Sequence, residues 1–381
     1  MRFGFKTSHL ASSISVMTVA AGLAFGPLTT QKSFAQTTLN GAGSTFVTTL
    51  LTALDQANTT ITINYAGGGS GAGRTAFLTQ SPAVAFGASD SPLAANQRTV
   101  TGSPNRGPAI QVPITTGPIA LAFNPAGLSV PSSGLRLSRR TYCGILNGAI
   151  TNWNNAAITS DNGRQVAANL PIRVVRRSDN SGTTFNLTSH LNTVCKGFTP
   201  SSFNWTRGAG QQVNWPSTFL SAEGGSGLVS LVGSTRGAIG YADESTRLSA
   251  GRTTTGRALL ANQSGNFVAP TAAATAAAFT GAVDTDPSPT IITLGGPSNN
   301  PTLLLNPPAA QAYPIVGPSY LLFYDIYSNA ATAAGIRSLV AGAFNSAGDA
   351  TATNLGYAPL PEALQTSVLT LVNNYVDTSA N

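Results

Sequence analysis

Short apolar runs recur along the chain and alternate with longer segments whose apolar residues have helical spacing. The short runs, which are typical of strands, cover residues 61–65, 83–87, 119–123, 172–175, 238–241 and 320–324. The longer segments, which are typical of amphipathic helices, cover residues 46–54, 184–194 and 330–344. Strands that alternate with helices in this way predict an α/β architecture.

Residues 269–309 depart from this alternation. Residues 272–279 form an Ala- and Thr-rich stretch that favours a helix, and Asp-Pro, Gly-Gly-Pro and Asn-Pro-Pro turns follow it. We therefore expect an irregular surface excursion of one lobe here, and not a third domain.

The N-terminus has the pattern of a cleaved export signal. Residues 2–9 include an Arg, a Lys and a His, residues 10–28 are mostly apolar, and a small-x-small pattern ends at Ala35. A transmembrane anchor is the alternative, but serines and glycines interrupt a run that would need about 20 strongly apolar residues. We expect residues 1–35 to be a cleaved signal peptide, which would make the mature protein periplasmic or secreted, and soluble.

The charged residues are few and argue against a nucleic-acid partner. The sequence has 20 Lys and Arg and 13 Asp and Glu, and only 9% of its residues are charged, so it has no basic stripe for a nucleic-acid backbone. Removal of the leader takes away three basic residues and no acidic one, which lowers the formal net charge from +7 to +4. Lys196 is the single lysine of the mature chain, so most of its cations are Arg, which suits oxyanion binding.

Length and cysteine content limit how the mature chain is organised. The chain is longer than one compact core usually supports, so we expect two lobes. Cys143 and Cys195 form an even pair, which in an exported protein indicates a disulfide, and two buried free thiols are the alternative. We expect no metal site, because His190 is the one mature histidine and no carboxylates cluster near either thiol.

Three turns rich in Gly, Ser and Thr share one layout, in which a strand or loop leads through small polar residues into a helix. They lie at residues 41–46, 67–73 and 179–184. Each can present free N–H groups and hydroxyls at a helix N-terminus, which is a favourable place for an anion. Ordinary helix capping explains any single turn. Three such turns, with Arg176 and Arg177 just before the third, favour an oxyanion site.

Asp90 narrows this interpretation to one kind of anion. It follows the strand predicted at residues 83–87 and precedes Pro92, so a helix N-cap is the ordinary role for it. A carboxylate beside a bound anion repels it unless the anion carries a proton to donate. Phosphate is partly protonated near neutral pH and sulfate is not, so a buried Asp90 would select phosphate over sulfate. It would not exclude arsenate.

The sequence lacks the usual patterns of an active site. A Ser-His-Asp site could use only His190, and no serine lies in a Gly-x-Ser-x-Gly elbow. No Walker-type phosphate loop, dinucleotide fingerprint or metal-spaced cluster is present in the sequence. We therefore expect a binding protein without catalytic residues or cofactors, in which His190 is a packed or surface residue of a helix.

Several short motifs have a specific joint order and spacing, although each alone is modest. They cover residues 39–46, 69–74, 87–90, 142–145 with 150–153, 177–184 and 237–241. In this order, and over most of the mature chain, the sequence resembles the periplasmic phosphate-binding component of the phosphate ABC importer (the PstS family), and most of all its DING-like branch.

The resemblance implies a two-lobed type II periplasmic-binding-protein fold with two hinge crossings and a ligand held between the lobes. We predict that residues 36–113 and 316–381 form lobe I and that residues 114–315 form lobe II. The crossings are expected near residues 112–123 and 313–325.

Carried over motif by motif, the resemblance also implies a phosphate site. Its expected members are Thr45, Phe46 (through its backbone), Ser70, Asp90, Arg177, Ser181, Gly182 and Thr183. Asp90 would accept the phosphate proton, Arg177 would neutralise charge, and Asp179 would hold Arg177 in place.

The sequence departs from the family pattern in a few places. Residues 39–43 read Leu-Asn-Gly-Ala-Gly where the branch has Asp-Ile-Asn-Gly-Gly. Gly71 stands where better-known transporter components have a second serine, so that hydrogen bond is missing or comes from backbone. Cys143 and Cys195 match a disulfide of the DING-like branch, whereas a second disulfide found in some relatives is impossible without further cysteines.

These inferences together predict a monomeric solute-binding protein whose partners are inorganic phosphate and the membrane permease of an ABC importer. Another tetrahedral oxyanion, such as sulfate or arsenate, is the alternative ligand. A secreted phosphate scavenger and a phosphatase-like protein, each without a transporter partner, are the alternative functions.

Overall fold

The computed structural model describes residues 1, 36–100, 106–279, 283–284, 289–294 and 302–378. The signal peptide predicted at residues 1–35 lies, apart from Met1, outside the described residues. Within the described part of the chain, no helix combines the length and the apolar character needed to cross a membrane.

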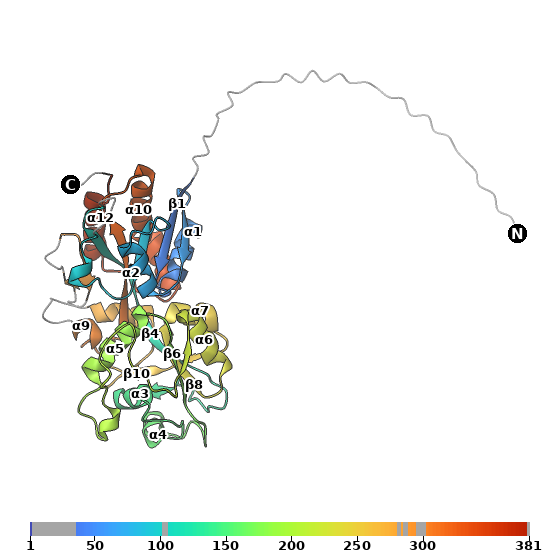
Figure 1. Ribbon diagram of the computed structural model, residues 1–381. Helices are drawn as coiled ribbons and strands as arrows, with labels where there is room; N and C mark the ends of the chain where they lie inside the picture. Colours follow the sequence, from blue (N-terminus) through green and yellow to red (C-terminus); the bar gives the residue numbers. More distant parts are fainter. Residues whose placement is uncertain (2–35, 101–105, 280–282, 285–288, 295–301, 379–381) are drawn as a thin grey trace. The chain divides into compact units, whose positions relative to one another are not determined.

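A mixed sheet runs through the structure (Figure 1). Its longest strand changes partner along its length. In spatial order the strands are β2 (Ile61–Ala66), β1 (Thr37–Gly43), β3 (Phe86–Ser89), β14 (Val316–Tyr324), β4 (Ala109–Phe123), β8 (Ala238–Asp243), β6 (Arg173–Arg177) and β7 (Leu220–Ala222), and β9 (Gly256–Arg257) pairs with β4. β4 pairs antiparallel with β14 up to Pro118 and with β8 from Ile119 onward. β4 and β14 therefore connect the two halves of the sheet, as the predicted crossings require. The lobe boundaries at residues 113/114 and 315/316 stay a prediction.

Helices accompany each half of the sheet. Those close in sequence to β1, β2 and β14 are α1 (Thr48–Ala57), α2 (Ser70–Leu78), α10 (Ala330–Ala343), α11 (Ser346–Asn354) and α12 (Glu362–Tyr375). Those of the middle of the chain are α3 (Arg139–Leu146), α4 (Ala156–Asn162), α5 (Gly182–Val194), α6 (Gly224–Ser234) and α7 (Glu244–Gly251). Shorter elements are β5 (Arg136–Leu137), β10 (Leu259–Ala261), β11 (Phe267–Val268), α8 (Ala272–Ala276), β12 (Val283–Asp284), β13 (Thr293–Leu294) and α9 (Thr302–Leu305).

The apolar spacing of α10 explains how a helix covers the sheet. The side chain of Asn329 accepts a hydrogen bond from the N–H of Ala331 and so caps the first turn. Ala333, Ile336 and Val340 follow at helical spacing and are all buried, and the helix packs on β1. The periodic segment predicted at residues 330–344 is therefore confirmed.

The predicted strands are confirmed, although several differ in extent, most of all those predicted at residues 83–87, 119–123 and 320–324, the last of which is the end of the longer β14. The run at residues 83–87 becomes a strand only from Phe86, because the ladder with β1 starts there. The run at residues 119–123 is the last part of the much longer β4, which is buried throughout. β4 contains Pro113 and Pro118, and Pro113 pairs with Tyr320 at the register shift between Ser319 and Tyr320 of β14.

The segment at residues 269–309 is less exposed than the sequence suggested. The predicted helical stretch corresponds to α8 and a single turn of 3₁₀-helix at Ala277–Phe279. Residues 280–282, 285–288 and 295–301 of this segment lie outside the described residues. Ile291 and Ile292 are buried, and the N–H of Ile292 donates to the carbonyl of Gln111 on β4. Part of the segment therefore packs on the sheet.

The two cysteines form the predicted disulfide. Cys143 on α3 is bonded to Cys195, which directly follows α5, and their Cα atoms are 5.7 Å apart. The alternative of two free thiols is therefore wrong. The bond ties α3 to the C-terminal end of the helix that begins at the third Gly/Ser/Thr turn.

His190, the one mature histidine, is a packed helix residue. It lies on α5, and only 1% of it is exposed. Its Nδ1 lies 2.5 Å from the carbonyl oxygen of Leu305, which can only accept, so Nδ1 carries the proton. Nε2 lies 2.9 Å from the hydroxyl of Tyr142 and accepts from it. Burial lowers the pKa of His190 to about 4.

This depressed pKa predicts a pH-dependent contribution to stability. The ordinary histidine pKa of about 6.5 applies to the unfolded chain, so the unfolded state binds the proton first as the pH falls. The contribution of neutral His190 to the free energy of unfolding is complete above a pH of about 6.5 and is lost as the pH falls to about 4. The pKa difference corresponds to about 3 kcal/mol of unfolding free energy. Urea unfolding of wild type and H190Q at pH 7 and pH 4 should show the smaller loss in the variant. Equal losses would contradict this account.

Candidate functional site

Asp90 follows β3 and lies at the centre of a buried polar cluster. Only 1% of it is exposed, and its carboxylate faces hydroxyl groups from four separate segments of the chain. Oδ1 accepts hydrogen bonds from Ser44 and from Ser319, the latter at 2.7 Å. Oδ2 makes longer contacts with the hydroxyls of Ser70, at 3.3 Å, and Thr183, at 3.5 Å. No helix begins directly after Asp90, since the next helical turn starts at Ala95 with Ala94 as its N-cap, so the alternative of a helix N-cap is wrong.

The first turn joins β1 to α1 and contributes Ser44, Thr45 and Phe46. It can bend so tightly because Gly43 has φ +144°, where a Cβ atom would lie 2.0 Å from the carbonyl oxygen of Ala88. The N–H of Phe46 donates to Ser44 Oγ at 3.0 Å. The N–H that was predicted to bind phosphate is thus engaged by a serine hydroxyl of the cluster.

The second turn places Ser70 as the first residue of α2. Gly69, with φ +92°, immediately precedes the helix, so the chain turns sharply into it. Ser70 Oγ accepts from the N–H of Asp90 at 3.1 Å, and the residue is buried. Ser70 therefore contacts both the backbone and the carboxylate of Asp90.

The third turn brings α5 against Asp90. Ser181 caps the helix by accepting from the N–H of Thr184 at 3.1 Å. At Gly182 a Cβ atom would lie 2.4 Å from Ser70 Oγ and 2.6 Å from Asp90 Cβ, so only glycine fits this contact. The first turn of α5 thus packs directly on Asp90, which follows β3, and on Ser70 of α2.

Arg177, at the end of β6, carries the positive charge of the cluster. Only 3% of Arg177 is exposed. Its guanidinium makes a two-point ion pair with the carboxylate of Asp179, in which Nε lies 2.7 Å from Oδ1. Asp179 Oδ1 also accepts from the N–H of Gly224, at the start of α6, at 3.1 Å. Burial would raise the pKa of Asp179, but the hydrogen bonds and charge of Arg177 outweigh burial and hold it below its ordinary value.

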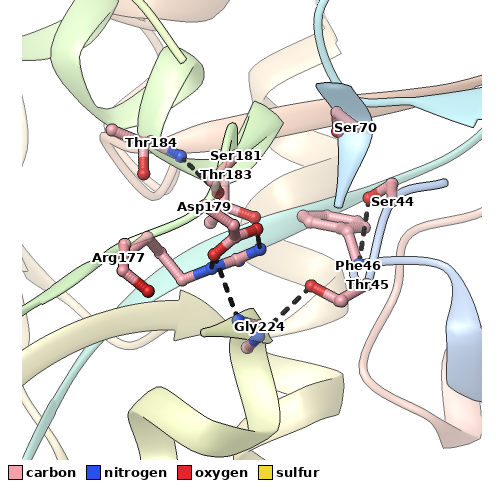
Figure 2. A network of polar contacts seen from close by, with 12 residues as sticks. Ser44, Thr45, Phe46, Ser70, Arg177, Asp179, Ser181, Thr183, Thr184 and Gly224 are labelled. Carbon is pink, nitrogen blue, oxygen red and sulfur yellow. Dashed lines mark hydrogen bonds and ion pairs between the residues drawn. The ribbon is translucent and has the colours of Figure 1, made fainter. Parts of the chain in front are cut away.

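Contacts between the turns close the cluster from both halves of the sheet. The hydroxyl of Thr45 accepts from the N–H of Gly225 at 3.2 Å, and the N–H of Gly71 donates to the carbonyl of Asn180 at 3.0 Å. Figure 2 shows Ser44, Thr45, Phe46 and Ser70 on one side, facing Arg177, Asp179, Ser181 and Thr183 on the other. A cavity of about 500 Å³ lies next to Thr45 and Gly225, but Asp90 does not line it.

The electrostatics of Asp90 reflect a conflict between burial and hydrogen bonding. Burial raises the pKa of Asp90 above its ordinary value, while the hydroxyls of Ser44, Ser319 and Ser70 and the charge of Arg177 lower it. A carboxylate in this setting can serve as an acceptor for a proton that a ligand supplies. Among the described residues, no group of three or more His, Cys, Asp or Glu could hold a metal ion.

All eight predicted site residues and Asp179 lie in this one cluster, so the structure brings together what the motifs suggested. Reasoning from the sequence missed Ser44, Ser319 and Asn186, whose side chain donates to the carbonyl of Asp90 at 2.9 Å. Ser44 lies inside one of the motifs, but the family resemblance assigned the phosphate contact there to its neighbour Thr45. Ser319 lies on a strand far along the chain, and no local pattern indicates it.

The sequence also matches known proteins. The family described as PBP superfamily domain matches over residues 28–340. The chain is 30% identical to the phosphate-binding protein PstS 3 of Mycobacterium leprae over 345 residues, which are 88% of this chain and 86% of that protein. The chain belongs to the PstS family. A second PstS relative, from Xylella fastidiosa, is 29% identical over 347 residues, which cover 89% of this chain and 86% of that protein.

Solved structures place this PstS-family chain among two-lobed proteins. A periplasmic phosphate-binding protein called PfluDING, solved with bound phosphate, superposes with a TM-score of 0.70 and 26% identity. The match covers 87% of this chain and 93% of that protein. A second structure, of a DING protein, has a TM-score of 0.69 and 25% identity, with 87% and 93% covered. The resemblance and the two-lobed α/β fold inferred from the motifs are confirmed.

The Arg177–Asp179 pair yields a stability prediction. Asp179→Ala leaves a buried guanidinium without its partner, which should lower the free energy of unfolding by about 3 kcal/mol. Glu223→Ala is a matched control, because Glu223 is an exposed acid just before Gly224 and should change stability by less than about 0.5 kcal/mol. Urea denaturation of both variants measures the difference. If D179A is no less stable than E223A, the buried pair does not have this structural role.

Proposed function

We propose that this protein binds inorganic phosphate between its two lobes and delivers it to the membrane permease of an ABC importer. The PstS relatives, named for phosphate binding, and the phosphate-bound PfluDING structure support the ligand. The observation in this chain that carries the proposal is Asp90, a buried carboxylate surrounded by hydroxyl donors and faced by a buried arginine. This combination suits an oxyanion that still carries a proton.

Each element of the cluster has a place in the proposed site. Thr45 and the Phe46 backbone would bind phosphate from the first turn, Ser70 would bind it from the second, and Asp90 would accept its proton. The third turn would complete the shell with Ser181, Gly182 and Thr183. Arg177, held by Asp179, would balance the negative charge, and helix N-terminal N–H groups favour an anion in the same place.

The contacts between the halves of the sheet suit a protein that closes on its ligand. Thr183 and Asn186 of α5 contact Asp90, and Gly225 of α6 contacts Thr45. β4 and β14 are the strands that would absorb the hinge motion as the lobes open. In this proposal the protein is a monomer without catalytic residues or cofactors, exported to the periplasm or secreted, and its closed form docks on the permease.

Asp90→Asn tests how the ligand is selected. The amide of asparagine can donate to an unprotonated sulfate oxygen, whereas the carboxylate can only accept. We expect the preference for phosphate over sulfate to fall by about 2 kcal/mol, or roughly 30-fold, because a hydrogen bond to a charged group is lost. Competition calorimetry with the two anions measures this ratio.

Asp325→Asn is the control for the loss of a buried carboxylate. Asp325 is 4% exposed, but it follows the far end of β14, away from Ser319, and should leave the ratio unchanged. A D90N variant that rejects sulfate as strongly as wild type would contradict the role of Asp90.

A further inference from the structure

Two serines outside the predicted site hold one oxygen of Asp90. The hydroxyls of Ser44 and Ser319 both donate to Oδ1, and the two residues are 1% and 0% exposed. The contacts on Oδ2, from Ser70 and Thr183, are longer, at 3.3 and 3.5 Å. The carboxylate is therefore held asymmetrically, with its short hydrogen bonds on the oxygen that faces away from the proposed phosphate ligands Ser70 and Thr183.

The backbone fixes how each of these hydroxyls is used. Ser44 Oγ accepts from the N–H of Phe46 at 3.0 Å, which leaves its own proton for Asp90. Ser319 lies at the register shift of β14, where the strand skips one residue of β4, and its hydroxyl reaches Oδ1 at 2.7 Å. Each serine thus supplies one donor to the same carboxylate oxygen.

We propose that Ser44 and Ser319 are specificity-determining positioning residues, which occupy Oδ1 of Asp90 and keep Oδ2 as the acceptor for a ligand proton. The inference rests on the proposed binding of phosphate. Two donors on Oδ1 stabilise the ionised carboxylate against the effect of burial. An ionised Asp90 accepts the proton of phosphate and repels sulfate. Without these donors a buried Asp90 protonates more readily, and a protonated carboxyl group can donate to sulfate.

Other titratable groups face Asp90 and bear on any measurement against pH. They are Arg177 at the end of β6, Asp243 at the end of β8, and the tyrosines Tyr65, Tyr320 and Tyr357. Burial raises the pKa of all three tyrosines, so they stay neutral below pH 9. Burial also raises the pKa of Asp243 to about 7. The variant Asp243→Asn is therefore measured as well, to separate the contribution of Asp243 to the pH dependence of binding.

The experiment uses the mature protein and its single variants S44A and S319A, together with the double variant. Calorimetric titration with phosphate and with sulfate, each from pH 5 to pH 9, gives the phosphate-to-sulfate ratio and the pH at which phosphate binding declines in acid. S44C and S319C replace a strong O–H donor by a weak S–H donor of similar shape. They test the role of the two hydroxyls if an alanine variant does not fold.

Ser89→Ala is the matched control. Ser89 is a buried serine next to Asp90, but its hydroxyl donates to the carbonyl of Ser91 at 2.7 Å and not to the carboxylate. We expect S89A to keep the wild-type ratio and the wild-type acid decline.

The expected result is a phosphate-to-sulfate ratio that falls about tenfold for each hydroxyl removed from Asp90. The acid decline should move to higher pH in the same variants, which a merely structural role would not cause. If both quantities match S89A and wild type, the inference is wrong while the proposed function stands. If wild type itself binds no phosphate, the proposed function is wrong and this inference falls with it.

Discussion

The burial of one carboxylate, that of Asp90, is the constraint on which the site depends. A buried charge is costly unless hydrogen-bond donors surround it, and here the donors come from four segments far apart in sequence. The first turn, α2, α5 and β14 must therefore meet at the end of β3. This requirement explains why small hydroxyl residues and glycines gather there. At Gly182, for example, α5 lies so close to Asp90 that no side chain fits between them.

The sheet meets this requirement through two strands. β14 lies between β3 and β4, so it brings Ser319 beside Asp90, and β4 continues past Pro118 to pair with β8. The same strands connect the part of the chain that carries Asp90 to the part that carries Arg177 and α5. A site whose halves belong to different lobes, joined by two strands, can change its contacts by bending those strands while each half keeps its own core.

The sequence predicted a large part of this architecture because its patterns are local. Apolar periodicity found α5 and α10, and the turns rich in Gly, Ser and Thr located the helix starts that surround Asp90. The length of β4 escaped prediction because its polar residues Gln111, Thr115 and Thr116 are buried by tertiary contacts that no local pattern records. Ser319 escaped for the same reason, since only the pairing of β14 with β3 brings it to Asp90.

The central claim is that a buried acceptor surrounded by hydroxyls and an arginine captures protonated phosphate. The most direct test is calorimetric titration of the phosphate-stripped mature protein, residues 36–381, first with phosphate and then with sulfate. The account predicts tight binding of one phosphate per chain and no heat from sulfate. A folded protein that gives no heat with phosphate, or that binds sulfate equally well, would contradict it.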